Sequence, residues 1–580
     1  MNTDEVQRRL WEQSQAHKQL RESGTPLFPT NPYGGRIRNL MDLMHNPTWI
    51  AAACDRVLKR SHGKAPGVDE VTTYEFGQNR EPRLEQLRLE LKCGTYRPLP
   101  LRRVEIPKAN GKMRPLGIPC LRDKIVQEAI RMALEPIFEA EFHDNSYGFR
   151  PNRSTHYAVY RCAQMAHSGF TWIIEGDVKA CFDEISHKAI MRCVREKVMD
   201  NKFLKLIHCL LKAGVEIDGT VHPTNKGVPQ GGVASPLLAN AVLNKLDWFL
   251  HSKGFHDSDG IRRWRHGLPN VRFARYADDW CVFLTRCDRQ YAERLRDEIR
   301  DFLRETCGLE LSAEKTRITH MRDGYDFLGF NISVGVGKSG ELVPKVRVGR
   351  KAITKIQRRL DEAIRYRPTQ ESISVRLVRG SAVIRGWSNY YKIAHNFSQV
   401  ANGLDHKAFW IAVKAISRKS DIATAKCLHR HRFGNTIGVH EDCTLARFAD
   451  TVPSHYYAAP NPYQPGNSPR YLEDDEWETA FVYHEQRRPG SGDLKWKALV
   501  RDGFHCRGCA VVVTSKTSHA DHIEPVNRFA NLAMANDLDN IQTLCRRCHD
   551  LKTARDKENR TIWKAGCLET CTSGLGLGPG

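Results

Sequence analysis

The sequence is organised around Val271–Leu284, VRFARYADDWCVFL, in which two apolar runs flank the tetrad Tyr276-Ala277-Asp278-Asp279. Apolar runs on both sides of a short polar segment predict a strand, a tight turn and a second strand. Two adjacent carboxylates at such a turn are costly to desolvate, because neighbouring like charges cannot both stay ionised without a counter-charge. A bound divalent cation would supply that charge, although a lone Asp-Asp pair also occurs in solvated turns.

A third carboxylate lies about a hundred residues upstream. In TWIIEGDVKACFDEISH, Asp177 follows the apolar run Trp172–Ile174, as expected of a strand that ends in a carboxylate. Together Asp177, Asp278 and Asp279 could hold two Mg²⁺ ions through oxygen ligands. In such sites the ions lie roughly 3.5–4 Å apart; one activates an attacking hydroxyl and the other stabilises the leaving oxygen of a phosphoryl transfer. This is polymerase chemistry.

The order of motifs resembles that of reverse transcriptases: the Asp177 strand, then GVPQGGVASPLLANAVLNKLD at Gly227–Asp247, then the YADD hairpin. Over residues 39–557 the chain is most similar to the group II intron-encoded proteins. The resemblance implies an α+β multidomain protein: a right-hand polymerase with fingers and palm, an α-helical thumb or maturase domain, and a small zinc-stapled ββα HNH domain.

Composition points to nucleic acid as the partner. The 580 residues carry 89 Lys and Arg against 67 Asp and Glu, a formal charge of +22. Such an excess favours phosphate neutralisation with counterion release, whereas a basic protein of a membrane surface is the alternative. We see no apolar run near the roughly 18 residues that a membrane span needs, so we expect a bacterial cytoplasmic location and no membrane partner.

Composition shifts and helical periodicity give the expected organisation. Apolar spacing predicts helices over residues 123–141, 187–213 and 235–250. The proposed domains are an N-terminal leader (1–38), fingers and palm (39–340), thumb or maturase domain (341–450), a linker that could contact DNA (451–490), an HNH endonuclease (491–560) and a disordered tail (561–580).

A basic hairpin is predicted within YRPLPLRRVEIPKANGKMRPLGIP, residues 96–119, with its turn at Asn110-Gly111. The resemblance implies that Lys108 and Arg114, on opposite arms, contact the triphosphate of the incoming nucleotide, where charge grows during transfer. A solvated basic hairpin is the alternative.

Two further residues acquire nucleotide roles from the resemblance. It implies that Phe182 packs under the sugar and blocks a 2′-hydroxyl, which would favour dNTPs, whereas the sequence alone would place Phe182 in the core. It also places Gln230, between glycines in GVPQGG, beside the nucleotide or the template base.

Three segments are candidates for RNA contact. SYGFRPNRS, residues 146–154, offers Arg150 and Arg153 beside aromatic residues, although an ordinary arginine-rich loop fits equally. KVRVGRKAITKIQRRLDEAIRYR, residues 345–367, carries nine Lys and Arg against two acids, opposite an apolar helical face. RGSAVIRGWSNYYKIAH, residues 379–395, resembles the maturase region that grips intron RNA. The candidates in the last two segments are Lys351, Lys355, Arg358, Arg359, Arg385 and Lys392. For residues 345–367 the alternative is a solvated surface helix, and for residues 379–395 it is aromatic packing in the core.

The last quarter of the chain contains two cysteine pairs, Cys506-x-x-Cys509 and Cys545-x-x-Cys548. In a chain without secretory features, two such pairs predict a tetrahedral Zn²⁺ site.

SHADHIEPV stands between the two pairs, LDNIQTLC ends at Cys545, and the second pair runs directly into His549; this arrangement resembles HNH nucleases. The resemblance implies that His522 is the general base, that Asp521 and His549 bind Mg²⁺ or Mn²⁺, and that Asn540 orients the base or the metal shell. A zinc ligand at His522 or His549 is the alternative.

The resemblance implies a multifunctional enzyme that copies RNA into DNA from dNTPs, assists splicing of its group II intron RNA, and nicks target DNA to generate the primer. Two other functions remain open at this point: an RNA-binding splicing factor, and an RNA-guided nuclease, each without polymerase activity.

Overall fold

The computed structural model describes residues 2–22, 36–61, 65–107, 113–254, 266–337, 342–366, 370–441, 443–453, 498–499, 501–502, 505–511, 513, 518–523, 540–549 and 552. The chain divides into two units at Val346/Arg347, and each is treated separately below. Among the described residues, none of the helices has the length and apolarity that crossing a membrane requires.

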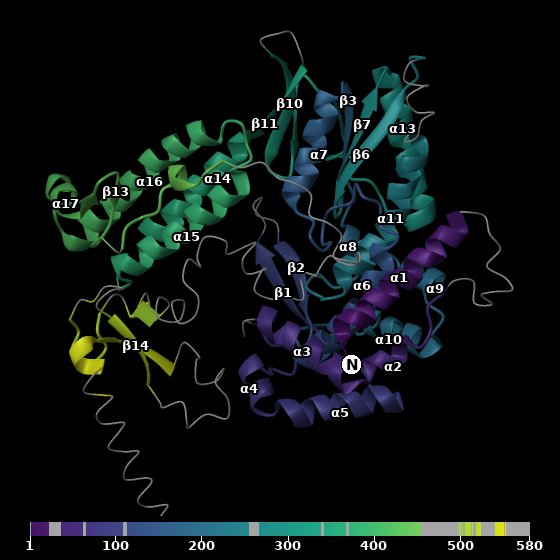
Figure 1. The fold of residues 1–580 in the computed structure, drawn as a ribbon, viewed down its shortest axis with the longest axis horizontal. Helices are drawn as coiled ribbons and strands as arrows, with labels where there is room; N and C mark the ends of the chain where they lie inside the picture. The colour runs from purple at the N-terminus through teal and green to yellow at the C-terminus, as the bar shows by residue number, and fades with distance from the viewer. Residues whose placement is uncertain are drawn as a thin grey trace, which may run out of the picture. The chain divides into compact units, whose positions relative to one another are not determined.

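The central sheet of the first unit has the order β6-β7-β3-β8, and all its neighbours are antiparallel. Its strands are β3 (Trp172–Asp177), β6 (Asn270–Tyr276), β7 (Asp279–Thr285) and β8 (Arg317–His320). The predicted strand–turn–strand unit is β6 and β7, which lie side by side next to β3 (Figure 1). Five of the seven β7 residues, from Trp280 to Leu284, are at most 1% exposed, because helices cover this sheet.

Helices pack on this sheet and on one another to form one apolar core. In the first unit they are α1 (Thr3–Glu22), α2 (Leu40–Met44), α3 (Pro47–Ser61), α4 (Thr73–Gln78), α5 (Arg80–Cys93), α6 (Leu121–Glu139), α7 (Thr155–His167), α8 (Cys181–Glu184), α9 (His187–Lys197), α10 (Asn201–Leu211), α11 (Ser235–Lys253), α13 (Arg289–Phe302) and the π-turn η1 (Leu303–Cys307). Helix α13 shows why they pack: Ala292, Leu295 and Ile299 recur at helical spacing and are buried.

A second sheet of the first unit has the order β2-β1-β4-β5. Its strands are β1 (Leu101–Pro107), β2 (Met113–Ile118), β4 (Val215–Ile217) and β5 (Thr220–His222). Antiparallel pairing of β1 with β2 gives the predicted basic hairpin, and its turn at Asn110-Gly111 lies outside the described residues.

The N-terminal helix packs more tightly than its polar composition suggests. Leu10 and Trp11 are each 8% exposed, and Gln7 Nε2 donates to the Met132 carbonyl of α6 at 2.8 Å. Residues 3–22 are therefore an integral part of the first unit. The sequence does not predict this packing, because the apolar face of α1 is narrow.

The single helix expected over residues 187–213 is two helices, α9 and α10. The chain leaves α9 at Val198, and Asp200 starts α10 by accepting a hydrogen bond from the Phe203 amide at 3.1 Å. The sequence does contain a signal for this break, because Asp200 is a favourable N-cap residue in the middle of a continuous apolar pattern.

A three-stranded sheet, β9 (Tyr325–Phe327), β10 (Phe330–Val336) and β11 (Leu342–Val348), ends the first unit and leads into the second. The helical part of the second unit consists of α14 (Arg350–Leu360), η2 (Asp361–Arg365), α15 (Ile373–Tyr391), α16 (Phe397–Ser420), α17 (Thr424–His431), β12 (Arg432–Phe433), β13 (Thr436–Ile437) and η3 (Phe448–Asp450). In the cysteine-rich part, β14 (Ser518–His522) pairs antiparallel with β15 (Ile541–Cys545). The proposed linker beyond residue 453 and the tail lie outside the described residues.

Candidate active site

Strand pairing brings the three predicted aspartates to one end of the central sheet. In the antiparallel register of β3 and β7, Asp177 is the direct partner of Asp279. Asp278 lies in the two-residue turn between β6 and β7, immediately before Asp279. Residues that face each other in an antiparallel pair have Cβ atoms roughly 5 Å apart, so carboxylates from distant segments share one site.

The carboxylates of this site repel one another, so a nearby positive charge would stabilise their ionised forms. Desolvation, followed by repulsion from Asp278 and Asp177, raises the pKa of Asp279 to about 7. Desolvation and the Asp177 charge also raise the pKa of Asp278. Lys315 partly offsets the repulsion: its Nζ lies 2.8 Å from Asp177 Oδ2, and this hydrogen bond raises the pKa of Lys315.

One ammonium does not neutralise three carboxylates, so the site retains a deficit of positive charge. The donors are hard oxygens, which Mg²⁺ prefers. The residues present therefore fit divalent cations, and binding of such ions would lower the pKa values that crowding has raised.

A buried arginine holds the hairpin that carries Asp278. Arg275 on β6 is fully buried and forms a two-pronged ion pair with Asp247 of α11, at 2.7 and 2.6 Å. Its Nη1 also donates to Asn240 and to the Ala277 carbonyl, both at 2.8 Å. Ala277 has a positive φ of 57°, a strained conformation for a non-glycine residue, and the Arg275 bond fixes it.

Gly148 allows a second segment to support the same turn. A Cβ at residue 148 would lie 2.3 Å from the Ala277 nitrogen, so the backbone approach requires glycine. The Gly148 carbonyl accepts a hydrogen bond from Asn240 at 2.7 Å, and the Tyr147 amide donates to the Arg275 carbonyl at 2.8 Å. Residues 145–148 thus brace the turn that carries Asp278.

We predict that Arg275→Met destabilises the protein by about 3 kcal/mol, because it leaves the Asp247 charge buried without a partner. Urea unfolding followed by circular dichroism measures this loss. The matched control is Arg289→Met: Arg289 is largely exposed and pairs with Glu293 on the surface of α13, so its loss should change stability by less than about 1 kcal/mol. Equal midpoints for the two variants would refute a structural role for the buried pair.

The predicted nucleotide residues Phe182 and Gln230 lie close to each other. The Val228 amide donates to the Phe182 carbonyl at 2.7 Å, and Gln230 Nε2 donates to Asp183 Oδ2 at 2.9 Å. Phe182 is half-buried at the start of α8, five residues after Asp177. It packs against the core and also meets the ring of Phe149 edge to face at 6.3 Å.

Arg114, one of the two cations predicted for the basic hairpin, is exposed on β2. Its positive charge offsets part of the desolvation and repulsion that raise the pKa of Asp278. Lys108 lies outside the described residues. The Gly117 amide of β2 donates to the Gln230 carbonyl at 3.0 Å, which ties the hairpin to the GVPQGG segment.

The prediction for Arg150 is wrong. Its side chain is 2% exposed, pairs with Glu139 at 2.9 Å and donates to the His143 and Ser146 carbonyls, so it has no surface to offer RNA. Arg153 keeps 21% of its side chain exposed, pairs with Asp144 at 3.2 Å and lies over the Tyr147 ring. The segment is mainly a structural brace.

The predicted RNA-contact residues of the thumb fall into two groups. Lys351, Lys355, Arg358 and Arg359 are exposed on α14, whereas Ile356 and Leu360 on the opposite face are buried, so the predicted amphipathic helix is present.

Arg385 and Lys392 are only half-buried, and burial lowers the pKa of Lys392. Neighbouring aromatic side chains pack among themselves: the Trp387 ring lies 4.6 Å from Tyr391 and 5.3 Å from Phe448. The aromatic residues of this segment serve the thumb core.

The four cysteines predicted to bind zinc come together. Their sulfur atoms all lie within 4.8 Å of one another, with Cys509 and Cys545 at 3.7 Å. Thiolates at these positions fit tetrahedral Zn²⁺. His522 and His549 do not belong to this four-sulfur cluster.

The candidate nuclease residues lie along β14 and β15. His522 faces Ile541 in the register, next to Asn540, whose carbonyl accepts the Ile523 amide at 2.6 Å. Asp521 pairs with Lys552 at 3.1 Å. The His549 ring stacks on the His519 ring, with the ring centres 4.7 Å apart, so His519 belongs to the same cluster.

Comparison with known proteins agrees with this geometry. The family model for reverse transcriptase (RNA-dependent DNA polymerase) matches residues 106–332, and the model for HNH endonuclease matches residues 506–555. Protein YkfC of Escherichia coli is 40% identical over 328 residues, which span 53% of this chain and 86% of that protein. The group II intron-encoded protein LtrA of Lactococcus lactis is 28% identical over 526 residues, 78% of this chain and 84% of LtrA.

The chain belongs to the group II intron-encoded proteins. It is an RNA-directed DNA polymerase, maturase and HNH endonuclease that acts with nucleic acids. Nuclear intron maturase 1 of Arabidopsis thaliana is also similar, with 27% identity over 331 residues, 43% of this chain and 46% of that protein. The family models for reverse transcriptase and for HNH endonuclease both match this chain. Neither alternative function, a splicing factor or an RNA-guided nuclease without polymerase activity, is therefore favoured.

Proposed function

We propose that Asp177, Asp278 and Asp279 hold two Mg²⁺ ions and that RNA is copied into DNA at this end of the central sheet. The observation that carries the proposal is the direct pairing of Asp177 with Asp279 across β3 and β7. When bound, the ions would supply a deprotonated primer hydroxyl and stabilise the leaving pyrophosphate.

The surrounding side chains have distinct roles in this proposal. Phe182 and Gln230 bind the sugar and base region of the dNTP, and Arg114, together with Lys108, binds its triphosphate. Lys315 holds the Asp177 carboxylate in place through their 2.8 Å ion pair. Arg275 is a positioning residue: it fixes the Ala277 carbonyl and so the orientation of Asp278.

We further propose that the four-cysteine cluster binds Zn²⁺ and holds an HNH nuclease together. His522 acts as general base for water at neutral pH. Asp521 and His549 bind one Mg²⁺ or Mn²⁺, and Asn540 orients the base. The adjacent ends of β14 and β15 support this assignment, because they set His522 next to Asn540.

The natural partners in this proposal are a group II intron RNA, a target DNA and dNTPs, inside a bacterial cell. The exposed basic face of α14, with Lys351, Lys355, Arg358 and Arg359, runs along the RNA backbone, and Arg385 and Lys392 contribute at its edge. The domain boundaries expected above stand as part of the proposal, with residues 3–22 added to the first unit.

The experiment that tests the division of labour is His522→Ala. We expect nicking of target DNA by the ribonucleoprotein to fall by about 10²-fold, because the general base is lost. Extension of a preformed primer should remain unchanged, because His522 is not part of the polymerase site. Ile523→Ala, an exposed neighbour at 40% exposure, is the matched control and should nick normally. Persistent nicking by the His522 variant would show that the base is assigned wrongly.

A further inference from the structure

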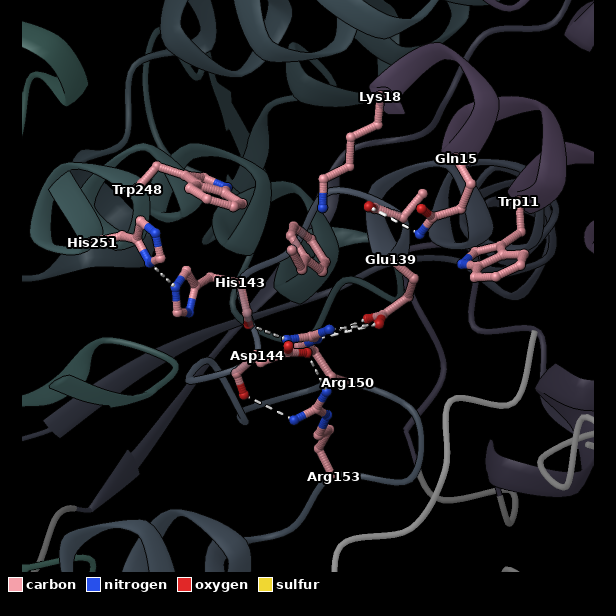
Figure 2. A pocket seen from close by; sticks show the side chains of 12 residues that line it. Trp11, Gln15, Lys18, Glu139, His143, Asp144, Arg150, Arg153, Trp248 and His251 are labelled. Carbon is pink, nitrogen blue, oxygen red and sulfur yellow. Dashed lines mark hydrogen bonds and ion pairs between the residues drawn. The ribbon is translucent and has the colours of Figure 1, made fainter. Parts of the chain in front are cut away.

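A cavity of about 420 Å³ in the first unit lies apart from the catalytic aspartates, and its lining comes from three segments (Figure 2). Helix α1 contributes Trp11, Gln15 and Lys18, which are spaced by four and three residues and so share one face. The end of α11 contributes Trp248 and His251. The stretch from Glu139 to Arg153 completes the wall.

Helix α1 is fixed over this cavity by side-chain bonds to α6. Gln7 Nε2 donates to the Met132 carbonyl at 2.8 Å, and Gln15 Nε2 donates to the Ala140 carbonyl at 3.2 Å. On the far side, Trp248 Nε1 donates to the Glu141 carbonyl at 3.1 Å. Both walls are therefore tied to α6 or to the residues that directly follow it, and the cavity is preformed.

The cavity contains a buried donor that lacks an acceptor. Trp11 is 8% exposed, and its indole Nε1–H has no hydrogen-bond partner among the residues that the structure describes. Figure 2 shows the Trp11 nitrogen on the side of the ring that faces Glu139 and the cavity. A buried donor without a partner is costly, so this atom points to an acceptor on a bound molecule.

The charges of the cavity favour an anionic ligand with a flat ring. Lys18 Nζ lies 5.4 Å from the centre of the Trp248 ring. The lining carries Lys18, Arg150 and Arg153 against Glu139 and Asp144. Glu139 pairs with Arg150 and Asp144 pairs with Arg153, so the net positive charge of the lining is that of Lys18. His143 Nδ1 accepts the Asn145 amide at 3.0 Å, so its neutral ring adds no charge.

We infer that this cavity binds one nucleotide. Its base would lie against Trp248 and accept a hydrogen bond from the Trp11 indole N–H, and its phosphate would meet Lys18. Unpaired bases are recognised by this combination of aromatic stacking, edge hydrogen bonds and nearby cations. The volume is within the usual range for small-ligand sites. The inference concerns a second site and is independent of the roles proposed for Asp177, Asp278 and Asp279.

The same chemistry is offered by a nucleotide extruded from an RNA strand and by a free mononucleotide. The test uses the full-length protein and two probes: a fluorescein-labelled RNA hairpin with one bulged adenosine, compared with the same hairpin without the bulge, and AMP alone. Fluorescence anisotropy measures the hairpins, and calorimetric titration measures AMP.

We expect Lys18→Ala to weaken binding of the bulged hairpin or of AMP by about tenfold, because one charged contact to the phosphate is lost. Trp11→Phe keeps the ring, removes only the donor, and should weaken binding by about fivefold. The matched control is Arg9→Ala, which removes an exposed charge from the same helix outside the cavity, and should change affinity by less than about twofold. Thermal melting of each variant verifies folding.

The outcomes separate the ligand sources. A preference for the bulged hairpin that Trp11→Phe reduces supports a nucleotide within RNA, whereas AMP binding that the same change weakens supports a free nucleotide. If the bulge makes no difference and AMP does not bind, the cavity is not a nucleotide site. Equal weakening by Lys18→Ala and Arg9→Ala would likewise overturn the inference, since it would reflect only net charge.

Discussion

Asp278→Asn should reduce cDNA synthesis on an RNA template by about 10³-fold, because one of three carboxylates that would bind the metal ions is neutralised. The substitution keeps the size of the side chain, so the turn between β6 and β7 should persist. Because the raised pKa of Asp278 reflects desolvation and repulsion from Asp177, removing its charge should not destabilise the fold. Primer extension with radiolabelled dNTPs measures the rate, and circular dichroism measures stability.

The matched control for this prediction is Asp323→Asn, at an exposed position in the turn that follows β8. It removes the same charge from the same unit and should retain wild-type extension. Splicing assistance should also be largely intact in Asp278→Asn, since it depends on RNA binding rather than on phosphoryl transfer. Equal loss of splicing and of cDNA synthesis would contradict separable roles.

Cys545→Ser should abolish zinc binding and disrupt the cysteine-rich part of the second unit. Four cysteine sulfurs within 4.8 Å of one another would supply the coordination, and structural zinc sites contribute on the order of 10 kcal/mol to folding of small domains. The pairing of β14 with β15 would then be lost, because Cys545 ends β15 opposite Ser518. We expect about one zinc per chain in the wild-type protein by atomic absorption, and almost none in the variant.

Nicking of DNA should disappear in the same variant, whereas extension of a preformed primer should continue. Cys93→Ser is the matched control, since Cys93 is exposed on α5, in the first unit, and lies outside the cluster. A wild-type protein without zinc, or with disulfides between these cysteines, would contradict the assignment.

The features that the sequence predicted are those encoded by local spacing. The apolar runs on each side of Asp278 and Asp279 predicted the hairpin, and the two C-x-x-C pairs predicted the sulfur cluster. Asp177 was identified because it ends an apolar strand. Each of these signals is contained in a few neighbouring residues, where the alternation of apolar and polar residues and the preferences of turn residues determine local structure.

What the sequence did not predict depends on partners far apart in the chain. Arg150 looked like an RNA contact, because nothing local indicates that Glu139 will bury it. Arg275 and Asp247 were not recognised as a pair, although each is a charge within an apolar stretch, and that is the signal that could have found them. Lys315 was missed because only the β3–β8 pairing brings its loop to Asp177.

The central claim is that Asp177 and Asp278 bind the same pair of metal ions, and iron-directed cleavage tests it most directly. Fe²⁺ in place of Mg²⁺, with ascorbate and peroxide, generates radicals that cut the backbone next to the bound ion. We predict fragments that end near residues 177 and 278, both suppressed by excess Mg²⁺ and both weakened in Asp278→Asn. Cleavage near only one of these residues, or near neither, would contradict a shared metal site.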